Sequence, residues 1–155
     1  MTQCFWHEYE IREIAEHREG LMPLLLVGDE QESQVRKYID DGRMYAAFRD
    51  GVAVAVVLVV RLSGNRWEIK NIAVDGTVRR MGLGRRMLEY VESVCGPRQV
   101  LSVGTGEAPR TLAFYRECGY VESHRVPDFF VDNYDHPVVD DGVLLKDMVY
   151  FVKYT

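Results

Sequence analysis

Apolar and β-branched residues gather in short runs in the middle of the chain, and such runs are typical of strands. Three runs have this character: residues 44–48, 52–62 and 67–74. Asp50-Gly51 joins the first two, and this dipeptide is a strong signal for a two-residue hairpin turn. Residues 63–65 turn the chain again before the third run. The pattern therefore predicts an antiparallel meander of three strands.

Apolar positions recur at helical spacing in other segments. Helices are predicted over residues 11–25, 30–39, 83–95 and 109–118. Pro109 suits the first position of the last helix, and Gly119 suits the position just after its end. A short strand over residues 4–9 is predicted to open the chain.

Strands are also predicted over residues 99–103, 120–126 and 147–154, with a long loop before the last of these. A helix that connects two neighbouring strands usually makes them parallel. The strands at 67–74 and 99–103 are therefore expected to lie side by side in parallel, within an otherwise antiparallel sheet.

The segment between the strand at 67–74 and the helix at 83–95 suggests a phosphate site. A helix N-terminus presents unpaired N–H groups and the positive end of its dipole, which together bind anions. Gly82 and Gly84 lack a Cβ, so that an anion can approach the backbone. The segment lacks the spacing of a P-loop or of a dinucleotide fingerprint. An ordinary helix N-terminus with two incidental glycines would give the same short pattern.

Composition narrows the class of protein. The 155 residues are 47% hydrophobic and 28% charged, as expected for a single globular domain over residues 1–155. A net charge of −5 argues against general nucleic-acid binding. The longest apolar run, residues 52–60, is too short to span a membrane. Three cysteines and four histidines show no metal-ligand spacing, so we expect a cytoplasmic protein with reduced thiols and no metal.

Two motifs carry a family resemblance. The first is Arg79-x-x-Gly82-x-Gly84, which follows a strand ending at Val74. The second is the stretch over residues 113–120, an aromatic pair followed by Gly119-Tyr120. With these motifs and this order of elements, the sequence resembles the GNAT superfamily of N-acetyltransferases. The resemblance implies an α/β chain with the GNAT (acyl-CoA N-acyltransferase) fold: a mixed, mostly antiparallel seven-stranded sheet, about four helices and a splayed, parallel central strand pair.

The resemblance also implies acetyl-CoA as cosubstrate and a set of residues that bind it. The pyrophosphate would contact Arg79, Arg80, Met81, Gly82, Leu83, Gly84 and Arg85, mostly through backbone amides. The pantetheine arm would pair with Ile72, Ala73 and Val74, and Thr105 and Tyr115 would complete the cofactor site. The arginines around Gly82 equally suit a solvated basic surface.

Acetyl transfer to an amine requires a neutral amine, and an alkyl amine with a pKa near 10.4 needs roughly 4 kcal/mol for deprotonation at neutral pH. Glu68 matches the position of a catalytic glutamate in some GNAT enzymes, and simple strand alternation places it on one face with Lys70, Ile72 and Val74. Its alternative role is an ion pair with Lys70, and an ordered water is the alternative base.

Tyr115 matches the tyrosine that commonly protonates the departing thiolate of coenzyme A in the family. A phenol with a pKa near 10 is a proton donor at neutral pH. The alternative is an aromatic core residue at helical spacing.

The loop over residues 128–141 bears on the acceptor. It contains no lysine or arginine, and its acidic residues are Asp128, Asp132, Asp135, Asp140 and Asp141. Phe129, Phe130 and Tyr134 add aromatic surface. Acidic groups beside aromatic rings suit a cationic amine, and a solvated acidic loop is the alternative.

Taken together, the sequence predicts an acetyl-CoA-dependent N-acetyltransferase that acts on a cationic small-molecule amine by direct attack in a ternary complex. Two alternatives remain open: a non-catalytic acetyl-CoA sensor, and an acetyltransferase of protein N-termini or lysines. Family resemblance also implies a homodimer. No nucleic-acid or membrane partner is expected.

Overall fold

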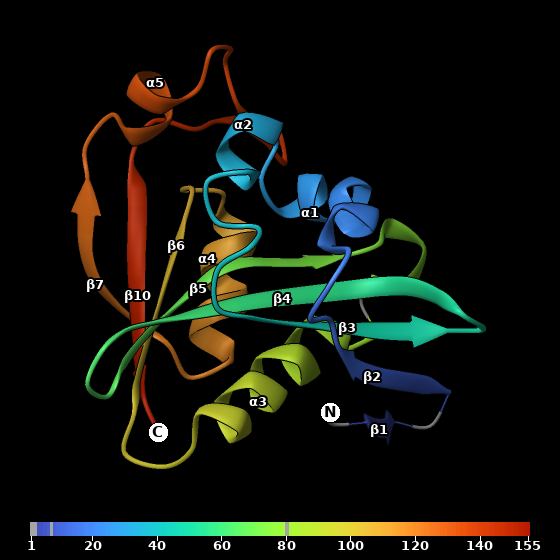
Figure 1. The fold of residues 1–155 in the computed structure, drawn as a ribbon. Helices are drawn as coiled ribbons and strands as arrows, with labels where there is room; N and C mark the ends of the chain where they lie inside the picture. Colours follow the sequence, from blue (N-terminus) through green and yellow to red (C-terminus); the bar gives the residue numbers. More distant parts are fainter. Residues whose placement is uncertain (1–2, 7, 80) are drawn as a thin grey trace.

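The computed structural model describes residues 3–6, 8–79 and 81–155 (Figure 1). Within these residues, an eight-stranded sheet has the order β1-β2-β3-β4-β5-β6-β10-β7. Its strands are β1 (Gln3–Trp6), β2 (Tyr9–Glu13), β3 (Arg43–Arg49), β4 (Val52–Ser63), β5 (Arg66–Val74), β6 (Val100–Thr105), β7 (Val121–Val126) and β10 (Met148–Tyr154). A separate hairpin consists of β8 (Val139–Asp140) and β9 (Val143–Leu144).

The described helices are α1 (Met22–Gly28), α2 (Glu32–Val35), α3 (Leu83–Cys95), α4 (Pro109–Glu117) and α5 (Phe129–Asn133). Short 3-10 turns occupy Arg18–Leu21 and Gly76–Val78. No helix in the described part of the chain has the length and apolarity needed to cross a bilayer.

The predicted strand pairings of the central sheet are confirmed. Strands β3, β4 and β5 form the antiparallel meander, and the turn residues Asp50 and Gly51 both have positive φ, at 51° and 79°. Strands β5 and β6 pair in parallel. The C-terminal strand β10 lies between β6 and β7 and is antiparallel to both.

The predicted helix over residues 11–25 is wrong in its first half. Ile11 belongs to β2, which pairs with β3 from Glu10↔Phe48 to Glu13↔Tyr45. Helix α1 begins only at Met22. The apolar residues of this segment fit both the helical and the strand period. Pairing with the edge of the meander favours the strand, and this tertiary contact cannot be read from the local sequence pattern.

Two other predicted elements differ in extent. The single strand predicted at residues 4–9 is the first part of a β1–β2 hairpin, which raises the strand number of the sheet from seven to eight; residue 7 lies outside the described residues. The helix predicted at 30–39 is a regular helix only over Glu32–Val35 and continues as turns.

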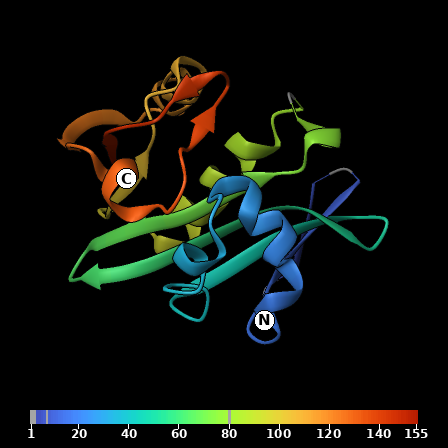
Figure 2. The ribbon, with the colours of Figure 1, turned by 90° about the horizontal axis from the view of Figure 1, so that it is seen from above.

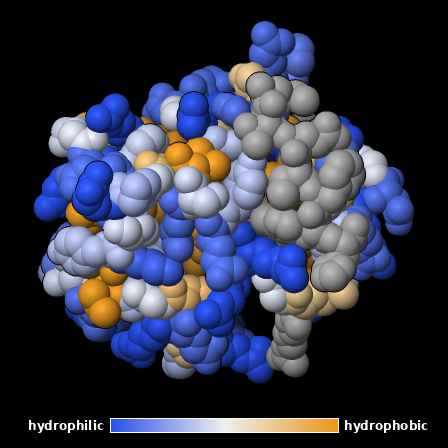
Figure 3. Space-filling view, turned by 90° about the horizontal axis from the view of Figure 1, so that it is seen from below, coloured by the Kyte–Doolittle hydropathy of each residue, from blue (hydrophilic) through white to orange (hydrophobic). Residues whose placement is uncertain are grey.

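The sheet separates two apolar cores. One lies under α3 and α4 and contains Leu88 and Tyr115. The other lies under α1 and α2 and contains Leu25 and Val35. Figure 2 shows α1 and α2 on one side of the sheet and α4 on the other. A third, smaller cluster around Phe130 holds the segment that precedes β10 against the rest. Hydrophilic residues cover much of the face seen in Figure 3.

Arg18 fixes the connection between β2 and α1. It is only 8% exposed, and its guanidinium donates hydrogen bonds of 2.7–3.0 Å to four backbone carbonyls, those of Ile14, Ile39, Asp41 and Gly42. The Arg18 side chain thus links Ile14, which precedes α1, to residues 39–42, which follow α2.

Replacement of Arg18 by Met should lower the free energy of unfolding by about 3 kcal/mol, because the carbonyls lose a charged donor in a buried setting. Chemical denaturation measures this change. Arg36→Met is the control: the exposed Arg36 pairs with the exposed Glu19 and Glu32, and such surface pairs contribute little. Equal denaturation midpoints for both variants would contradict this role of Arg18.

Candidate active site

The segment between β5 and α3 forms a short capped turn that ends in a helix N-terminus. The Asp75 carboxylate accepts hydrogen bonds from the backbone N–H and the hydroxyl of Thr77, at 2.9 and 2.7 Å, which hold the pKa of Asp75 below its usual range. The first helical hydrogen bond of α3 runs from Arg86 N to Gly82 O. The amides of Leu83, Gly84 and Arg85 therefore face the end of the helix without a helical acceptor.

The two glycines of this segment serve different purposes. Gly82 caps α3 with a φ of 76°, a conformation that favours glycine, and a Cβ there would meet open space. At Gly84 a Cβ would lie 3.2 Å from Cζ of Phe114 on α4. The missing side chain of Gly84 thus lets α3 approach α4 closely, whereas the sequence interpretation assigned it to anion access.

The remaining residues of the predicted phosphate site are placed as follows. Arg79 Nε lies 3.5 Å from Val74 O, and the exposed Arg85 lies 3.9 Å from Glu89. Met81 is 53% exposed. Arg80 lies outside the described residues.

A bulge in β5 changes the face on which its side chains lie. On β4, Val59 pairs with Ile69 and the preceding residue, Leu58, pairs with Asn71. Lys70 is therefore the extra residue of β5. The predicted common face for Glu68, Lys70, Ile72 and Val74 is therefore wrong. Beyond the bulge, Ile72 and Val74 pack against the core under α3, whereas Glu68 shares its face with Asn71 and Ala73.

The parallel pairing of β5 with β6 runs only from Arg66↔Val100 to Ile69↔Val103, and the two strands separate at the bulge. The amide of Asp75 donates to Val54 O on β4. Because backbone polar groups point alternately to the two sides of a strand, those of Ile72 and Val74 point away from β4, toward the gap between β5 and β6.

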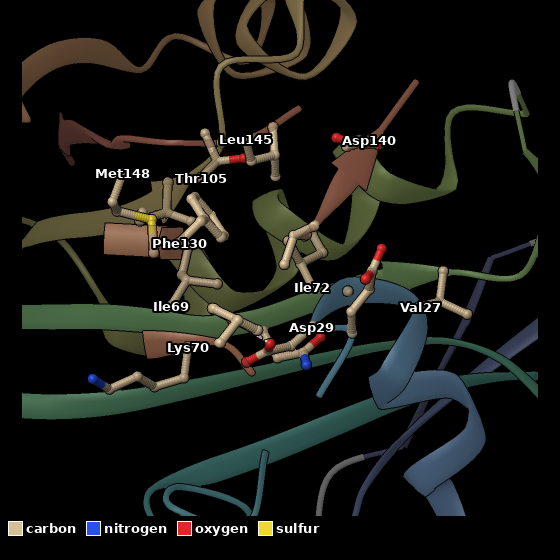
Figure 4. Close-up of a pocket in the computed structure, with 18 of the residues that line it drawn as sticks. Val27, Asp29, Ile69, Lys70, Ile72, Thr105, Phe130, Asp140, Leu145 and Met148 are labelled. Carbon is tan, nitrogen blue, oxygen red and sulfur yellow. Dashed lines mark hydrogen bonds between the residues drawn. The ribbon is translucent and has the colours of Figure 1, made fainter. Parts of the chain in front are cut away.

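A cavity of about 190 Å³ lies at this gap (Figure 4). Its walls come from both faces of the sheet: Gly28 ends α1 on one face and Asp29 follows it, and Tyr115 belongs to α4 on the other face. The segment before β10 contributes Phe130 and Leu145. The separated strands thus open a passage through the sheet.

This cavity collects only some of the predicted site residues. Ile72, Thr105 and Tyr115 line it. Glu68, Ala73, Val74 and the residues of the phosphate segment do not. The Glu68 carboxylate lies 3.2 Å from Lys70 Nζ, and Figure 4 shows the Lys70 side chain extending away from the other labelled residues.

Tyr115 is a protonated phenol in an apolar setting. The residue is 5% exposed, and its ring contacts Phe114, Tyr120 and Phe151 with centroids 5.1–6.1 Å away. Burial raises the pKa of Tyr115 far above its ordinary value. Among the described residues, none forms a hydrogen bond with its hydroxyl, which leaves this proton donor available within the cavity wall.

The acidic loop contributes less to the cavity than the sequence suggests. Of its five aspartates only Asp140 lines the cavity, and its carboxylate accepts from the Thr111 hydroxyl at 3.2 Å. The other acidic residues of the cavity wall, Asp29 and Glu30, come from the end of α1 and were not predicted. No sequence motif marks them.

The β8–β9 hairpin that carries Asp140 was also not predicted, although a signal exists. Asp141 and Gly142 both have positive φ, at 50° and 77°, and form the same Asp-Gly turn as the one between β3 and β4. The flanking strands contain two residues each, too few to show an alternating pattern.

This arrangement of a splayed strand pair, a helix N-terminus and a tyrosine matches a known family. The family model described as "Acetyltransferase (GNAT) family" matches residues 6–120. The chain belongs to this family. The predicted family and fold are therefore confirmed, and the protein is a GNAT acetyltransferase.

Individual relatives agree with this assignment. A curated relative, "Uncharacterized N-acetyltransferase YvbK" of Bacillus subtilis, is 28% identical over 86% of this chain and 88% of its own. The structure of an "IAA acetyltransferase" from Bacillus cereus has 28% identity and a TM-score of 0.84, over 93% of this chain and 97% of its own. A Bacillus subtilis acetyltransferase solved in complex with CoA has 25% identity and a TM-score of 0.81, over 94% and 97%.

The described residues contain no group of three or more His, Cys, Asp or Glu side chains arranged to hold a metal ion. The histidine near the cavity, His136, has another role. Its Nδ1 lies 2.7 Å from Asp135 Oδ1, and its Nε2 lies 3.1 Å from Glu30 Oε2. It joins the segment before β10 to the end of α1, beside the cavity.

The pKa of His136 should lie above its ordinary value of 6.5, because hydrogen bonds to Asp135 and then Glu30 favour the charged ring. A raised folded-state pKa means that this stabilisation is complete below pH 6.5 and is lost as the pH rises through the raised value. Titration of the imidazole by NMR measures it. Combined Glu30→Gln and Asp135→Asn changes should return the pKa toward 6.5, and a wild-type pKa at or below 6.5 would contradict the contact.

Proposed function

We propose that this GNAT acetyltransferase transfers the acetyl group of acetyl-CoA to a primary amine, by direct attack within a ternary complex. The observation that carries the proposal is the passage at the β5–β6 splay. It brings unpaired backbone groups of β5 and the hydroxyl of Tyr115 to one cavity, which is also lined by acidic residues from the opposite face of the sheet.

The cofactor would approach along β5 and end at α3. The free amides of Leu83, Gly84 and Arg85, with the positive end of the helix dipole, suit a pyrophosphate. The pantetheine arm would hydrogen-bond to Ile72 and Val74 as an added strand, where β6 has separated from β5. A Bacillus subtilis relative was solved in complex with CoA, which supports CoA as the ligand.

Transfer would then proceed at the cavity. The neutral amine attacks the thioester carbonyl, whose developing negative charge is stabilised by the backbone N–H of Val74. The intermediate collapses with cleavage of the C–S bond, and the Tyr115 phenol donates its proton to the departing thiolate. The amine loses its own proton to Glu68 or to an ordered water. Because Glu68 does not line the cavity, a water between Glu68 and the amine suits this geometry better than direct contact.

A non-catalytic acetyl-CoA sensor would share the helix N-terminus and the splayed strands. It would have no use for a buried, protonated tyrosine without an internal partner, so the position of Tyr115 favours the enzyme. An acetyltransferase of protein N-termini or lysines remains the second candidate.

Arg85→Glu should weaken acetyl-CoA binding by roughly tenfold or more, because it places a negative charge beside the proposed pyrophosphate site. The side chain is exposed, and a glutamate in the first turn of a helix is favourable, so folding should persist. Isothermal titration calorimetry measures the binding. Arg66→Glu, the same change at the far end of β5, is the control and should bind normally. Equal affinities for the two variants would argue against a pyrophosphate site at the N-terminus of α3.

Tyr115→Phe should retain acetyl-CoA binding and lose activity by roughly 100-fold in kcat, the contribution typical of general acid catalysis. The phenylalanine ring keeps the aromatic packing. A coupled assay of thiol release measures kcat, and calorimetry measures binding. Full activity in this variant would rule out Tyr115 as the proton donor, and loss of binding would indicate a structural role instead.

A further inference from the structure

Asp29 is held in an unusual position. It follows the last residue of α1 and lines the cavity, where the helix dipole disfavours a negative charge. Each of its carboxylate oxygens accepts one phenol: Tyr38 donates to Oδ2 at 2.9 Å and Tyr134 to Oδ1 at 2.6 Å. Burial and the nearby carboxylate raise the pKa of both tyrosines, so both stay proton donors. The carboxylate is therefore fixed in direction.

The charge of Asp29 has no cationic partner among the described residues. Glu30 has His136, but Asp29 receives hydrogen bonds only from neutral hydroxyls. Lys70, the cavity residue with a positive charge, pairs with Glu68 and extends away. Asp29 thus lacks a cationic partner among the described residues, whereas Glu30 has His136.

Asn71 helps to orient the Tyr38 phenol that donates to Asp29. It lies at the bulge of β5, lines the cavity and is 4% exposed. Its Nδ2 uses both hydrogens, toward Leu25 O at 2.9 Å and Tyr38 Oη at 3.0 Å. Its Oδ1 is buried without a partner and faces Gly28, another residue of the cavity wall, where a Cβ would approach it to 2.4 Å.

We propose that Asp29 binds a positively charged amino group of the acceptor and determines its specificity. A carboxylate favours the charged form of an amine and raises its pKa. The amine bound to Asp29 is therefore not the one that is acetylated, because the attacking amine must be neutral.

It follows that the acceptor carries at least two amino groups: one is held as an ammonium at Asp29, and the other reacts at the splay. The rings of Phe130 and Tyr134, stacked 5.4 Å apart in the wall, suit the alkyl chain and the charge of such a compound. This inference rests on the proposed acetyl transfer and names its acceptor as a diamine or polyamine.

The test has a binding arm and a kinetic arm. In the first, putrescine is titrated by calorimetry into the protein saturated with CoA, which cannot acetylate it. Wild type should bind putrescine, and Asp29→Asn should weaken the affinity roughly tenfold, as expected for loss of a desolvated charge pair. Asp132→Asn is the control, since it removes the same charge from an exposed residue outside the cavity.

In the kinetic arm, thiol release from acetyl-CoA is compared for putrescine and butylamine. Wild type should show a kcat/KM roughly tenfold or more higher for the diamine, and Asp29→Asn should remove this preference by raising the KM for putrescine. The KM for acetyl-CoA should stay unchanged. Thermal unfolding and the charge-conserving Asp29→Glu variant show whether the fold persists.

Two outcomes would overturn the inference: no binding of putrescine by the CoA-loaded wild type, or equal binding by wild type and Asp29→Asn. Either would leave the acetyl-CoA site intact. Failure of the proposed function appears differently, as the absence of acetyl-CoA binding by the folded protein.

Discussion

The loss of pairing between β5 and β6 is the constraint on which the rest of the site depends. Parallel pairing ends at Ile69↔Val103, and the bulge at Lys70 starts the divergence. Without this divergence, the backbone of Ile72 would be paired and the sheet would be closed. With it, one strand offers unpaired polar groups at the point where the cavity crosses the sheet. The hydrogen bonds that the two strands forgo become available to ligands.

The second consequence of this geometry is a short covalent path between the two ends of the proposed cofactor site. Strand β5 ends at Val74, and α3 begins at Leu83. The turn between them is fixed by the Asp75–Thr77 hydrogen bonds and by the positive φ of Gly82. Packing of Gly84 on Phe114 then holds the helix N-terminus against α4, the helix that carries Tyr115.

The sequence predicts elements well where local signals and tertiary structure agree. The Asp50-Gly51 turn, the β5–α3 unit and the parallel strand pair are such cases, because hairpin turns and crossover connections are constrained over short distances. The segment around Ile11 fits two periods, and only its pairing with β3 decides between them. The bulge at Lys70 depends on the register of β4, so its effect on Glu68 was not predictable from alternation.

Prediction of the site was limited in the same way. Tyr115 was predicted from a motif and Thr105 from the family resemblance, and both line the cavity. Asp29 and Asn71 were not predicted, because their positions in the cavity wall depend on contacts with Tyr38 and Tyr134, which lie up to 105 residues away in the chain. The role of Glu68 stays a prediction.

The cavity wall is built from parts of the chain that lie far apart in the sequence. Phe130, Tyr134, Asp140 and Leu145 line the cavity and come after residue 120, where the match to the family model ends. All residues of the proposed cofactor site precede residue 120. Substitutions in residues 128–147 would therefore change the cavity wall without changing the residues of the proposed cofactor site.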